Sequence, residues 1–394
     1  MPHPHSLCVH EADDPRTTRP HVLPIYPTAS YVFDSIEQGM DIFAGRQQGH
    51  VYSRYGNPTT EAVAEKLARL EVHGSELKAS GILLSSGMAA FTTLFMALLR
   101  SGDKVLSQAN IYGGTTELLK AFAKLGIETV WVDLNRAEAV EQALKENPDI
   151  RLLLLESPAN PAMQCVDIAL LSDLAHQYGA WCAVDNTFAT PLLQQPLLLG
   201  ADFSIYSTTK YINGHGNSLA GAIIGKEIEL MQTKVWKSMC LNGTNASPWE
   251  AWLTANGIKT LHLRMRQHSE NALAVAQFLE RQPQVLRVNY PGLPSHPQHQ
   301  IAKKQMKAFG GMLSFELKGG LEAGIRWMNA LQLIRLVPTL GEVESMALHP
   351  ASMSHRNIPP EIRRKNGISD GLIRLSVGIE VLEDLLQDVQ RGLA

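Results

Sequence analysis

Cysteine is scarce in this sequence. The four cysteines, at positions 8, 165, 182 and 240 of 394, are far apart and form no C-x-x-C pair. This spacing excludes a disulfide framework and argues against a structural zinc site, so we expect no metal centre. Unpaired thiols are typical of a reducing compartment, and the first ten residues lack the apolar run of a secretory signal. We therefore expect a cytoplasmic protein.

Long apolar runs and an excess of charge of one sign are also lacking. No stretch reaches the roughly 18 consecutive apolar residues of a membrane span. The 35 basic and 38 acidic residues leave a net charge of −3, which gives no electrostatic reason to expect nucleic acid or an anionic membrane as a partner. No G-x-G-x-x-G opens a helix after the first predicted strand, which removes a nicotinamide-dependent dehydrogenase from consideration.

The sequence divides by pattern into three parts. Residues 1–55 are rich in proline and histidine and broken by turns, so we expect an arm that cannot bury itself and lies on a neighbouring subunit. Residues 56–245 alternate short apolar runs with helical stretches, which predicts an α/β domain. Residues 246–394 begin with a long helical segment, Pro248 to Arg281, and continue with short strands and helices. They are predicted to form a smaller α+β domain.

Runs that are apolar throughout and separated by helices are typical of strands covered on both faces. Such runs are Gly81–Leu84, Lys104–Ser107, Thr129–Val132, Arg151–Glu156, Trp181–Asp185, Phe203–Tyr206 and Ala220–Ile224. We therefore expect an open, largely parallel sheet in a three-layer α/β/α arrangement. Ligands of such sheets bind beyond the carboxyl ends of the strands, so the residues that end these runs are candidates for function.

Three of these run ends carry chemistry that fits one cofactor. Lys210 follows the run Phe203–Tyr206 behind three hydroxyl residues, and Asp185 ends the preceding run. A carboxylate favours the protonated form of a nearby ring nitrogen, and a protonated ring can accept electrons from a carbanion. Taken alone, each residue also has a simpler interpretation: Lys210 as a surface lysine in a polar loop, and Asp185 as a capping or turn residue.

The third run end is Ser86-Gly87-Met88, which joins a strand to a helix. Backbone N–H groups at a helix N-terminus bind phosphate, although small residues at this position are often plain caps. Ser207 and Thr209 can add hydroxyl donors to the same phosphate. Together the three run ends indicate a phosphorylated cofactor with a protonated ring, bound in the α/β domain.

Seven motifs, in order along nearly the whole chain, resemble the Cys/Met-metabolism family of pyridoxal-phosphate enzymes. That family includes cystathionine γ-synthase, cystathionine γ-lyase, methionine γ-lyase and the homoserine sulfhydrylases. The motifs are Tyr52-Ser-Arg-Tyr-Gly-Asn-Pro-Thr59, Ser86-Gly-Met88, Tyr112-Gly-Gly-Thr115, Glu156-Ser-Pro-Ala-Asn-Pro161, Asp185-Asn-Thr-Phe188, Thr209-Lys-Tyr-Ile-Asn-Gly-His215 and Arg374-Leu-Ser-Val-Gly378. The resemblance implies the aspartate-aminotransferase-like fold (fold type I) and a homotetramer built from two dimers.

The resemblance also implies a role for each matching residue. Lys210 holds pyridoxal phosphate as a Schiff base and moves protons, Asp185 pairs with the ring nitrogen, and Tyr112 stacks on the ring near the γ-leaving group. The phosphate is bound by Ser86, Gly87, Met88, Ser207 and Thr209, and by Tyr52 and Arg54 of a neighbouring subunit. Arg374 binds the substrate α-carboxylate, with Asn160 nearby.

Four positions depart from the family pattern. Val51 stands where cystathionine-handling relatives tend to have an acid, and Gly114 where methionine γ-lyases typically have cysteine. Asn217 replaces a common Asp or Thr. Pro338-Thr339 replaces the usual residue-plus-serine pair, which puts the carboxylate contact from serine in doubt, although Thr339 keeps a hydroxyl.

The sequence favours γ-elimination from a sulfur amino acid, because Val51 offers no charge to the far end of cystathionine. The segment His349 to His355 also resembles methionine γ-lyases. The alternatives are γ-replacement on an O-acylhomoserine, as in a cystathionine γ-synthase or homoserine sulfhydrylase, and cystathionine γ-lyase activity. A non-catalytic binding member of the family is a remote alternative that intact Lys210, Asp185, Tyr112 and Arg374 argue against.

Overall fold

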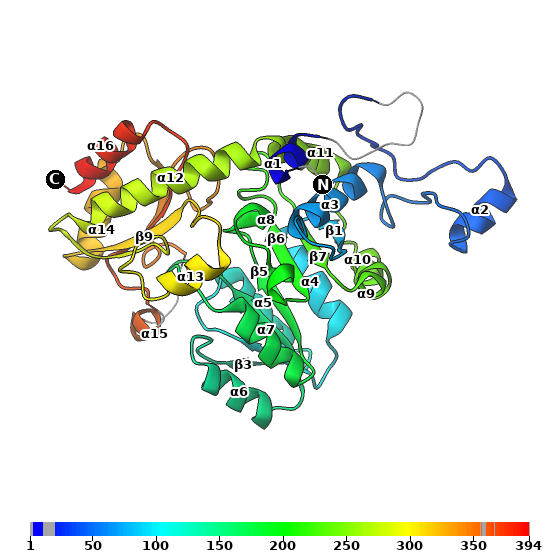
Figure 1. The fold of residues 1–394 in the computed structure, drawn as a ribbon, viewed down its shortest axis with the longest axis horizontal. Helices are drawn as coiled ribbons and strands as arrows, with labels where there is room; N and C mark the ends of the chain where they lie inside the picture. The colour runs from blue at the N-terminus through cyan, green and yellow to red at the C-terminus, as the bar shows by residue number, and fades with distance from the viewer. Residues whose placement is uncertain (1–2, 11–19, 355, 357–359, 366, 394) are drawn as a thin grey trace.

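Two β-sheets organise the chain (Figure 1). The structure is a computed structural model that describes residues 3–10, 20–354, 356, 360–365 and 367–393. His355, the last residue of one motif used above, lies outside the described residues. None of the helices in the described ranges combines the length and hydropathy needed to cross a membrane.

The larger sheet has seven strands in the order β1-β7-β6-β5-β4-β2-β3. Its strands are β1 (Ser80–Leu84), β2 (Lys104–Ser107), β3 (Glu128–Trp131), β4 (Ile150–Glu156), β5 (Trp181–Asp185), β6 (Phe203–Ser207) and β7 (Gly221–Gly225). All seven predicted runs are therefore strands. The sheet is parallel from β6 to β3, while β7 runs antiparallel to both β1 and β6.

Alternate side chains of the central strands pack on opposite faces of this sheet. On β4, Leu152 and Leu154 belong to one buried apolar cluster, and Leu153 and Leu155 to another. This is the two-residue period of a strand that is covered on both faces. The helices of this region are α3 (Pro58–Glu71), α4 (Gly87–Leu98), α5 (Gly113–Ala123), α6 (Ala137–Glu146), α7 (Ile168–Gln177), α8 (Thr190–Leu193), α9 (Ile228–Leu230) and α10 (Trp236–Asn242).

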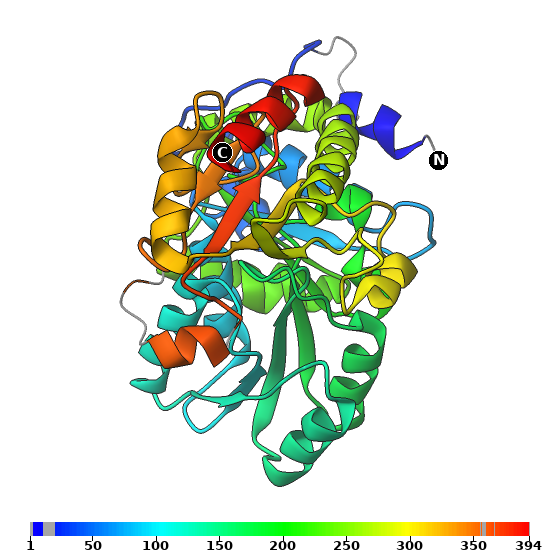
Figure 2. The same cartoon turned by 90° about the vertical axis from the view of Figure 1, so that its left-hand side faces the viewer.

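The smaller sheet has five mostly antiparallel strands in the order β10-β11-β12-β9-β8. Its strands are β8 (Val285–Asn289), β9 (Met312–Leu317), β10 (Arg335–Leu336), β11 (Met346–Leu348) and β12 (Leu372–Ser376). The helices of this part are α11 (Pro248–Lys259), α12 (Leu261–Glu280), α13 (His299–Gln305), α14 (Gly320–Ala330), α15 (Pro360–Lys365) and α16 (Leu382–Leu393). Figure 2 shows α12 and α16 packed over this sheet. The domain boundary at position 245 stays a prediction.

Two sequence predictions need correction at the level of elements. The single helical segment expected from Pro248 to Arg281 is two helices, which meet at Thr260. The first of them, α11, packs against α3 of the preceding part of the chain. Strand β3, at the edge of the sheet, is half-exposed rather than covered on both faces, since Glu128 and Trp131 are exposed and Thr129 and Val130 only partly buried.

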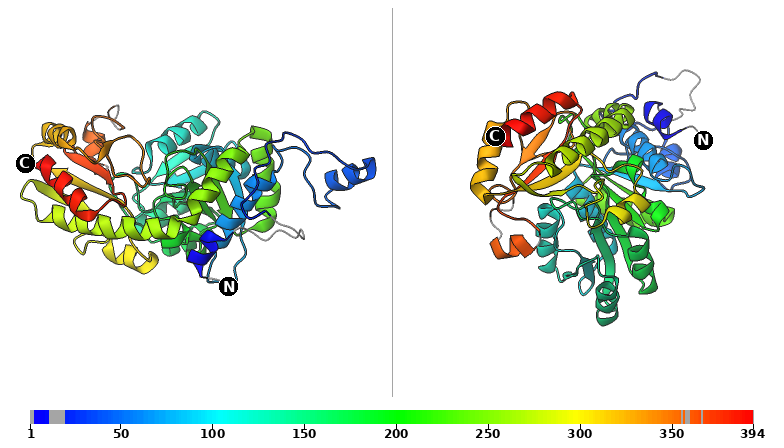
Figure 3. Two further views of the ribbon diagram at one scale, coloured as in Figure 1. Left: turned by 90° about the horizontal axis from the view of Figure 1, so that it is seen from above. Right: turned by 60° about the vertical axis from the view of Figure 1, so that its left-hand side comes forward.

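The two helices of the N-terminal arm differ in how they pack. Its first helix, α1 (Pro4–Val9), buries Leu7 and Cys8 in the core of its own chain, so the expectation that the arm cannot bury itself is wrong for this helix. Its second helix, α2 (Ile36–Phe43), extends away from the body of the chain (Figure 3). Leu7 and Cys8 pack against apolar residues of their own chain. Residues 20–50, in contrast, are mostly turns and extended chain on either side of α2.

Candidate active site

The carboxyl ends of three neighbouring strands meet at one cavity of about 200 Å³. Strand β4 ends in Glu156, β5 in Asp185 and β6 in Ser207, as expected for a ligand site on a parallel sheet. The cavity is lined by Ser86, Gly87, Met88, Phe91, Tyr112, Glu156, Pro158, Asn160, Asp185, Thr187, Phe188, Ser207, Thr209, Lys210, Leu219, Pro338, Leu340 and Arg374. Arg374 comes from β12, so both sheets contribute side chains.

Lys210 lies in a tight turn directly after β6. Its Nζ donates a hydrogen bond to Thr339 Oγ1 at 2.9 Å. Burial lowers the pKa of Lys210 to about 8, with a smaller contribution from the Arg374 charge. A lysine with this pKa is a substantially better nucleophile and proton acceptor at neutral pH than a solvent-exposed one.

Asp185 is a part-buried carboxylate that lines another part of the cavity wall. The backbone N–H and the hydroxyl of Thr187 both donate to Asp185 Oδ1, at 3.1 and 2.6 Å. Burial raises the pKa of Asp185, and these hydrogen bonds act against that rise. A protonated ring nitrogen at Asp185 would favour its ionised form and relieve the cost of burying it.

The amino end of α4 forms the third wall. Ser86 caps the helix by accepting the N–H of Ala89 at 3.0 Å, and the first-turn N–H groups of Gly87 and Met88 point out of the helix for a ligand. A Cβ on Gly87 would lie 2.8 Å from Ser207 Cβ, so only glycine keeps this space open. Thr209 differs slightly from expectation, because its hydroxyl already contacts the carbonyl of Ala220 at 3.1 Å.

These three walls fit pyridoxal phosphate. The carboxylate of Asp185 could pair with the ring nitrogen, the amine of Lys210 could react with the aldehyde, and the backbone N–H groups of α4 with the hydroxyl of Ser207 could bind the phosphate. Phosphate at a helix N-terminus is a common arrangement in proteins. The sequence prediction for these groups therefore corresponds to one contiguous site.

A guanidinium completes the site. Arg374 Nη1 donates to Asn160 Oδ1 at 3.3 Å, and Nη2 donates to the carbonyl of Thr339 at 3.0 Å. Arg374 is 5% exposed, and an arginine this buried is held by several acceptors. Its fork suits a bidentate contact with a carboxylate. Thr339 itself faces Lys210 with its hydroxyl and Arg374 with its carbonyl.

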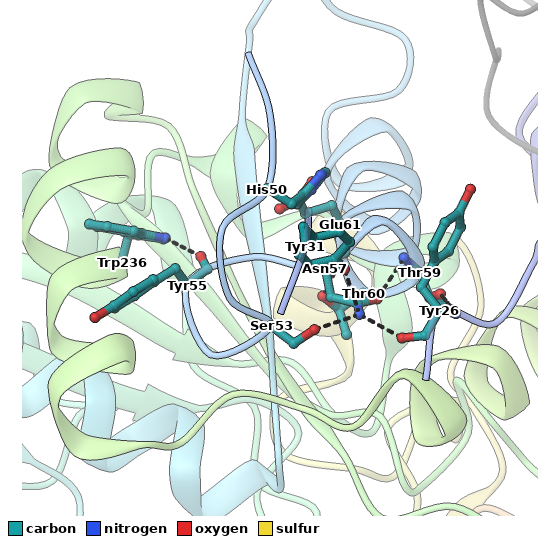
Figure 4. A network of polar contacts seen from close by, with 10 residues as sticks. All are labelled: Tyr26, Tyr31, His50, Ser53, Tyr55, Asn57, Thr59, Thr60, Glu61 and Trp236. Carbon is teal, nitrogen blue, oxygen red and sulfur yellow. Dashed lines mark hydrogen bonds and ion pairs between the residues drawn. The ribbon is translucent and has the colours of Figure 1, made fainter. Parts of the chain in front are cut away.

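Tyr52 and Arg54 do not line the cavity of their own chain. The guanidinium of Arg54 stacks 4.6 Å from the ring centre of Tyr55 and donates to the carbonyl of Cys240. The segment that carries both residues is nevertheless held firmly (Figure 4). Asn57 Nδ2 donates to Ser53 Oγ at 3.0 Å, and Trp236 Nε1 donates to the carbonyl of Tyr55 at 2.6 Å.

Sequence reasoning assigned no role to several cavity residues. Thr187 orients Asp185, and Glu156 accepts two backbone N–H groups inside the site. Glu156 had the same signal as Asp185, a carboxylate that ends a buried run. Phe91, Leu219 and Leu340 come from distant segments and had no signal in the sequence.

Comparison with known proteins agrees with this geometry. The family described as Cys/Met metabolism PLP-dependent enzyme matches residues 5–394. An L-methionine gamma-lyase of Pseudomonas putida is 46% identical over 94% of this chain and 92% of that protein. An O-succinylhomoserine sulfhydrylase of Pseudomonas aeruginosa is 44% identical over 94% of this chain and 90% of that protein.

Solved structures show the same architecture. Cystathionine gamma synthase from Xanthomonas oryzae pv. oryzae superposes with a TM-score of 0.92 at 38% identity, over 100% of this chain and 98% of that one. The predicted fold class, a three-layer α/β/α part followed by a smaller α+β part, is thereby confirmed. The chain belongs to the Cys/Met metabolism family of pyridoxal-phosphate-dependent enzymes.

Proposed function

We propose that this enzyme catalyses γ-elimination from L-methionine or a related sulfur amino acid. With L-methionine, the substrate and one water give 2-oxobutanoate, ammonia and methanethiol. The observation that carries the proposal is the set of charged groups in the cavity. Its support from relatives is that proteins named L-methionine gamma-lyase are 42 to 46% identical to this chain.

Among the described residues that line the cavity, the charged side chains are Glu156, Asp185, Lys210 and Arg374. Asp185 and Lys210 are assigned to the cofactor and Arg374 to the substrate carboxylate, and Glu156 accepts two backbone N–H groups. The uncharged lining includes apolar side chains such as Phe91, Leu219 and Leu340. A short uncharged thioether fits this lining better than a γ-substituent with a second amino and carboxylate group, because unpaired charges are costly to desolvate.

The roles of the residues follow from their positions. Arg374, held by Asn160 and the Thr339 carbonyl, binds the substrate carboxylate, and Lys210 Nζ takes up the proton from the α carbon. Bound pyridoxal phosphate supplies the electron sink for the pair that this proton leaves behind. Tyr112 lies over the cavity with its ring 48% exposed, where its hydroxyl can protonate the departing sulfur.

A second candidate is γ-replacement on an O-acylhomoserine. The observation that favours it is the 44% identity to the O-succinylhomoserine sulfhydrylase, which is close to that of the γ-lyases. Both reactions use the same carboxylate and cofactor contacts and differ in what attacks at the γ carbon. Gly114, where methionine γ-lyases typically have cysteine, leaves this choice open to experiment.

Product analysis decides between the two reactions. The purified holoenzyme is incubated with L-methionine, and separately with O-succinylhomoserine plus sulfide or cysteine. We expect 2-oxobutanoate and methanethiol from methionine, and Lys210→Ala to abolish both. Absence of a 2-oxo acid from methionine, together with formation of homocysteine or cystathionine, would replace the first proposal by the second.

We also propose that the site is shared between copies of this chain, in the cytoplasm, as a dimer or a tetramer of two dimers. Support comes from the rigid Tyr52–Arg54 segment, which lies off its own cavity. Further support is the apolar face of the arm, where Val32 is 96% and Phe43 70% exposed. Apolar side chains this exposed are typical of an interaction surface. The four free cysteines support a reducing compartment.

A further inference from the structure

Among the described charged side chains that line the cavity, Glu156 is the one with no part in the roles above. It ends β4 and is the register partner of Asp185, which ends β5. It is 5% exposed and lines the cavity. Burial raises the pKa of Glu156 well above its ordinary value, and repulsion from the Asp185 carboxylate on the adjacent strand end adds to this rise.

Both carboxylate oxygens of Glu156 are used. Oε2 accepts the backbone N–H of Tyr112 at 2.7 Å, and Oε1 accepts the backbone N–H of Asn160 at 2.7 Å. These two hydrogen bonds stabilise the ionised form and so act against the rise in the pKa of Glu156. The side chain therefore bridges two loops that are distant in sequence.

Each of these loops carries one end of the site. Tyr112 precedes α5 without a side-chain cap and is 48% exposed, and the bond from its N–H to Glu156 holds its backbone. On the other side, Asn160 Oδ1 contacts Arg374, and Arg374 reaches the carbonyl of Thr339. The hydroxyl of Thr339 accepts from Lys210.

We propose that Glu156 is a positioning residue, which fixes the spacing between Tyr112 and the Asn160–Arg374 pair by binding one backbone N–H of each loop. Because this inference rests on the proposed function, it deepens that proposal. In the proposed mechanism Tyr112 contacts the γ-substituent and Arg374 binds the carboxylate. The distance between these two side chains therefore determines how the two ends of the amino acid lie in the site. Small errors in such a spacing cost much of the rate.

The chemistry of the position explains why a carboxylate is needed. Glutamine has the same length and no charge to bury, but it has one acceptor oxygen. Its NH₂ group would face one of the two backbone N–H donors, so one loop would lose its anchor. Aspartate keeps the charge but is one methylene shorter, so it cannot reach both N–H groups at once.

The test compares Glu156→Gln and Glu156→Asp with Asp388→Asn. Asp388 is a matched control, because it is 1% exposed and accepts the backbone N–H groups of Gln332, Leu333 and Ile334 at 2.9 to 3.0 Å, away from the cavity. The first readout is amide hydrogen exchange of the holoenzyme over segments 110–113 and 159–162. The second is the split between KM and kcat for the amino-acid substrate.

We expect both Glu156 variants to exchange about tenfold faster in at least one of these segments, the change that loss of one hydrogen bond produces. We expect KM to rise by a similar factor, while Asp388→Asn loses thermal stability with KM unchanged. Wild-type exchange at both segments in either Glu156 variant would overturn the inference. An unfolded Gln variant leaves the Asp variant to decide. Amide exchange is measured without turnover. The exchange result therefore tests the role of Glu156 even if the enzyme does not act on methionine.

Discussion

Lys210 and Asp185 are ionisable side chains that burial shifts toward their neutral forms. The pKa of Lys210 falls to about 8, whereas that of Asp185 rises. The lowered pKa of Lys210 was expected from the sequence as an effect of burial, whereas the rise for Asp185 was not. Their partners were not foreseeable. Thr187 acts within its own turn, but the Thr339 contact joins positions 129 residues apart.

Glu71 is a second buried carboxylate, behind the site. Its carboxylate accepts hydrogen bonds from the hydroxyl of Ser204 at 2.7 Å and from the hydroxyl of Tyr206. The Tyr206 oxygen in turn accepts a hydrogen bond from Asn186 Nδ2 at 2.9 Å. Burial raises the pKa of Glu71 to about 7. The folded state thus holds this proton up to about pH 7, whereas the unfolded chain releases it near its ordinary value of about 4.3, so this group makes folding less favourable as pH rises between those values.

We therefore expect the melting temperature of Glu71→Gln minus that of wild type to be higher at pH 8 than at pH 5. Glutamine keeps an acceptor for the hydroxyls but has no charge to bury. Thermal unfolding at both pH values measures this. Glu65→Gln, an exposed change on the same helix, is the reference. A difference for Glu71→Gln that is the same at both pH values would contradict the account.

At the scale of elements, α11 approaches the Lys210 turn very closely. A Cβ on Gly257 would lie 2.3 Å from the backbone oxygen of Asn213. Arg264 of α12 adds to this contact by donating to the carbonyls of Tyr211 and Ile212 at 2.6 and 3.1 Å. Two helices thus hold the turn that presents the amine.

Gly257→Ala should destabilise the protein by about 1–3 kcal/mol, the usual cost of overpacking. We also expect weaker cofactor binding, because the turn that carries Lys210 must shift. Urea unfolding and cofactor titration measure these effects, and Asn256→Ala on the same helix is the control. Unchanged stability and cofactor affinity in Gly257→Ala would show that the turn is not held by this contact.

The elements were largely predictable, and the exceptions have physical reasons. Every apolar run became a strand, because runs covered on both faces have a strong pattern. The antiparallel direction of β7 was not predictable, since the apolar pattern of the run Ala220–Ile224 is the same for a parallel and an antiparallel buried strand. The end of α11 at Thr260 carries no proline, so the sequence did not signal that a second helix begins at Leu261.

At the scale of the whole molecule, the arm is expected to join copies of the chain. Ile36 and Phe43 on α2 are 74% and 70% exposed. Replacing both with aspartate should shift the protein to a smaller assembly and lower its cofactor content, because Tyr52 and Arg54 would no longer reach a neighbour. Light scattering and cofactor absorbance measure the two effects. The control is Glu37→Gln on the same helix, and a wild-type protein that is monomeric yet fully active would contradict the shared site.

Lys210 and Asp185 are expected to bind the same cofactor ring in this cavity. Borohydride reduction of the holoenzyme, followed by digestion and mass spectrometry of every lysine-containing peptide, tests this. We expect the pyridoxyl group to be retained on Lys210. Retention on another lysine, or on none, would contradict it.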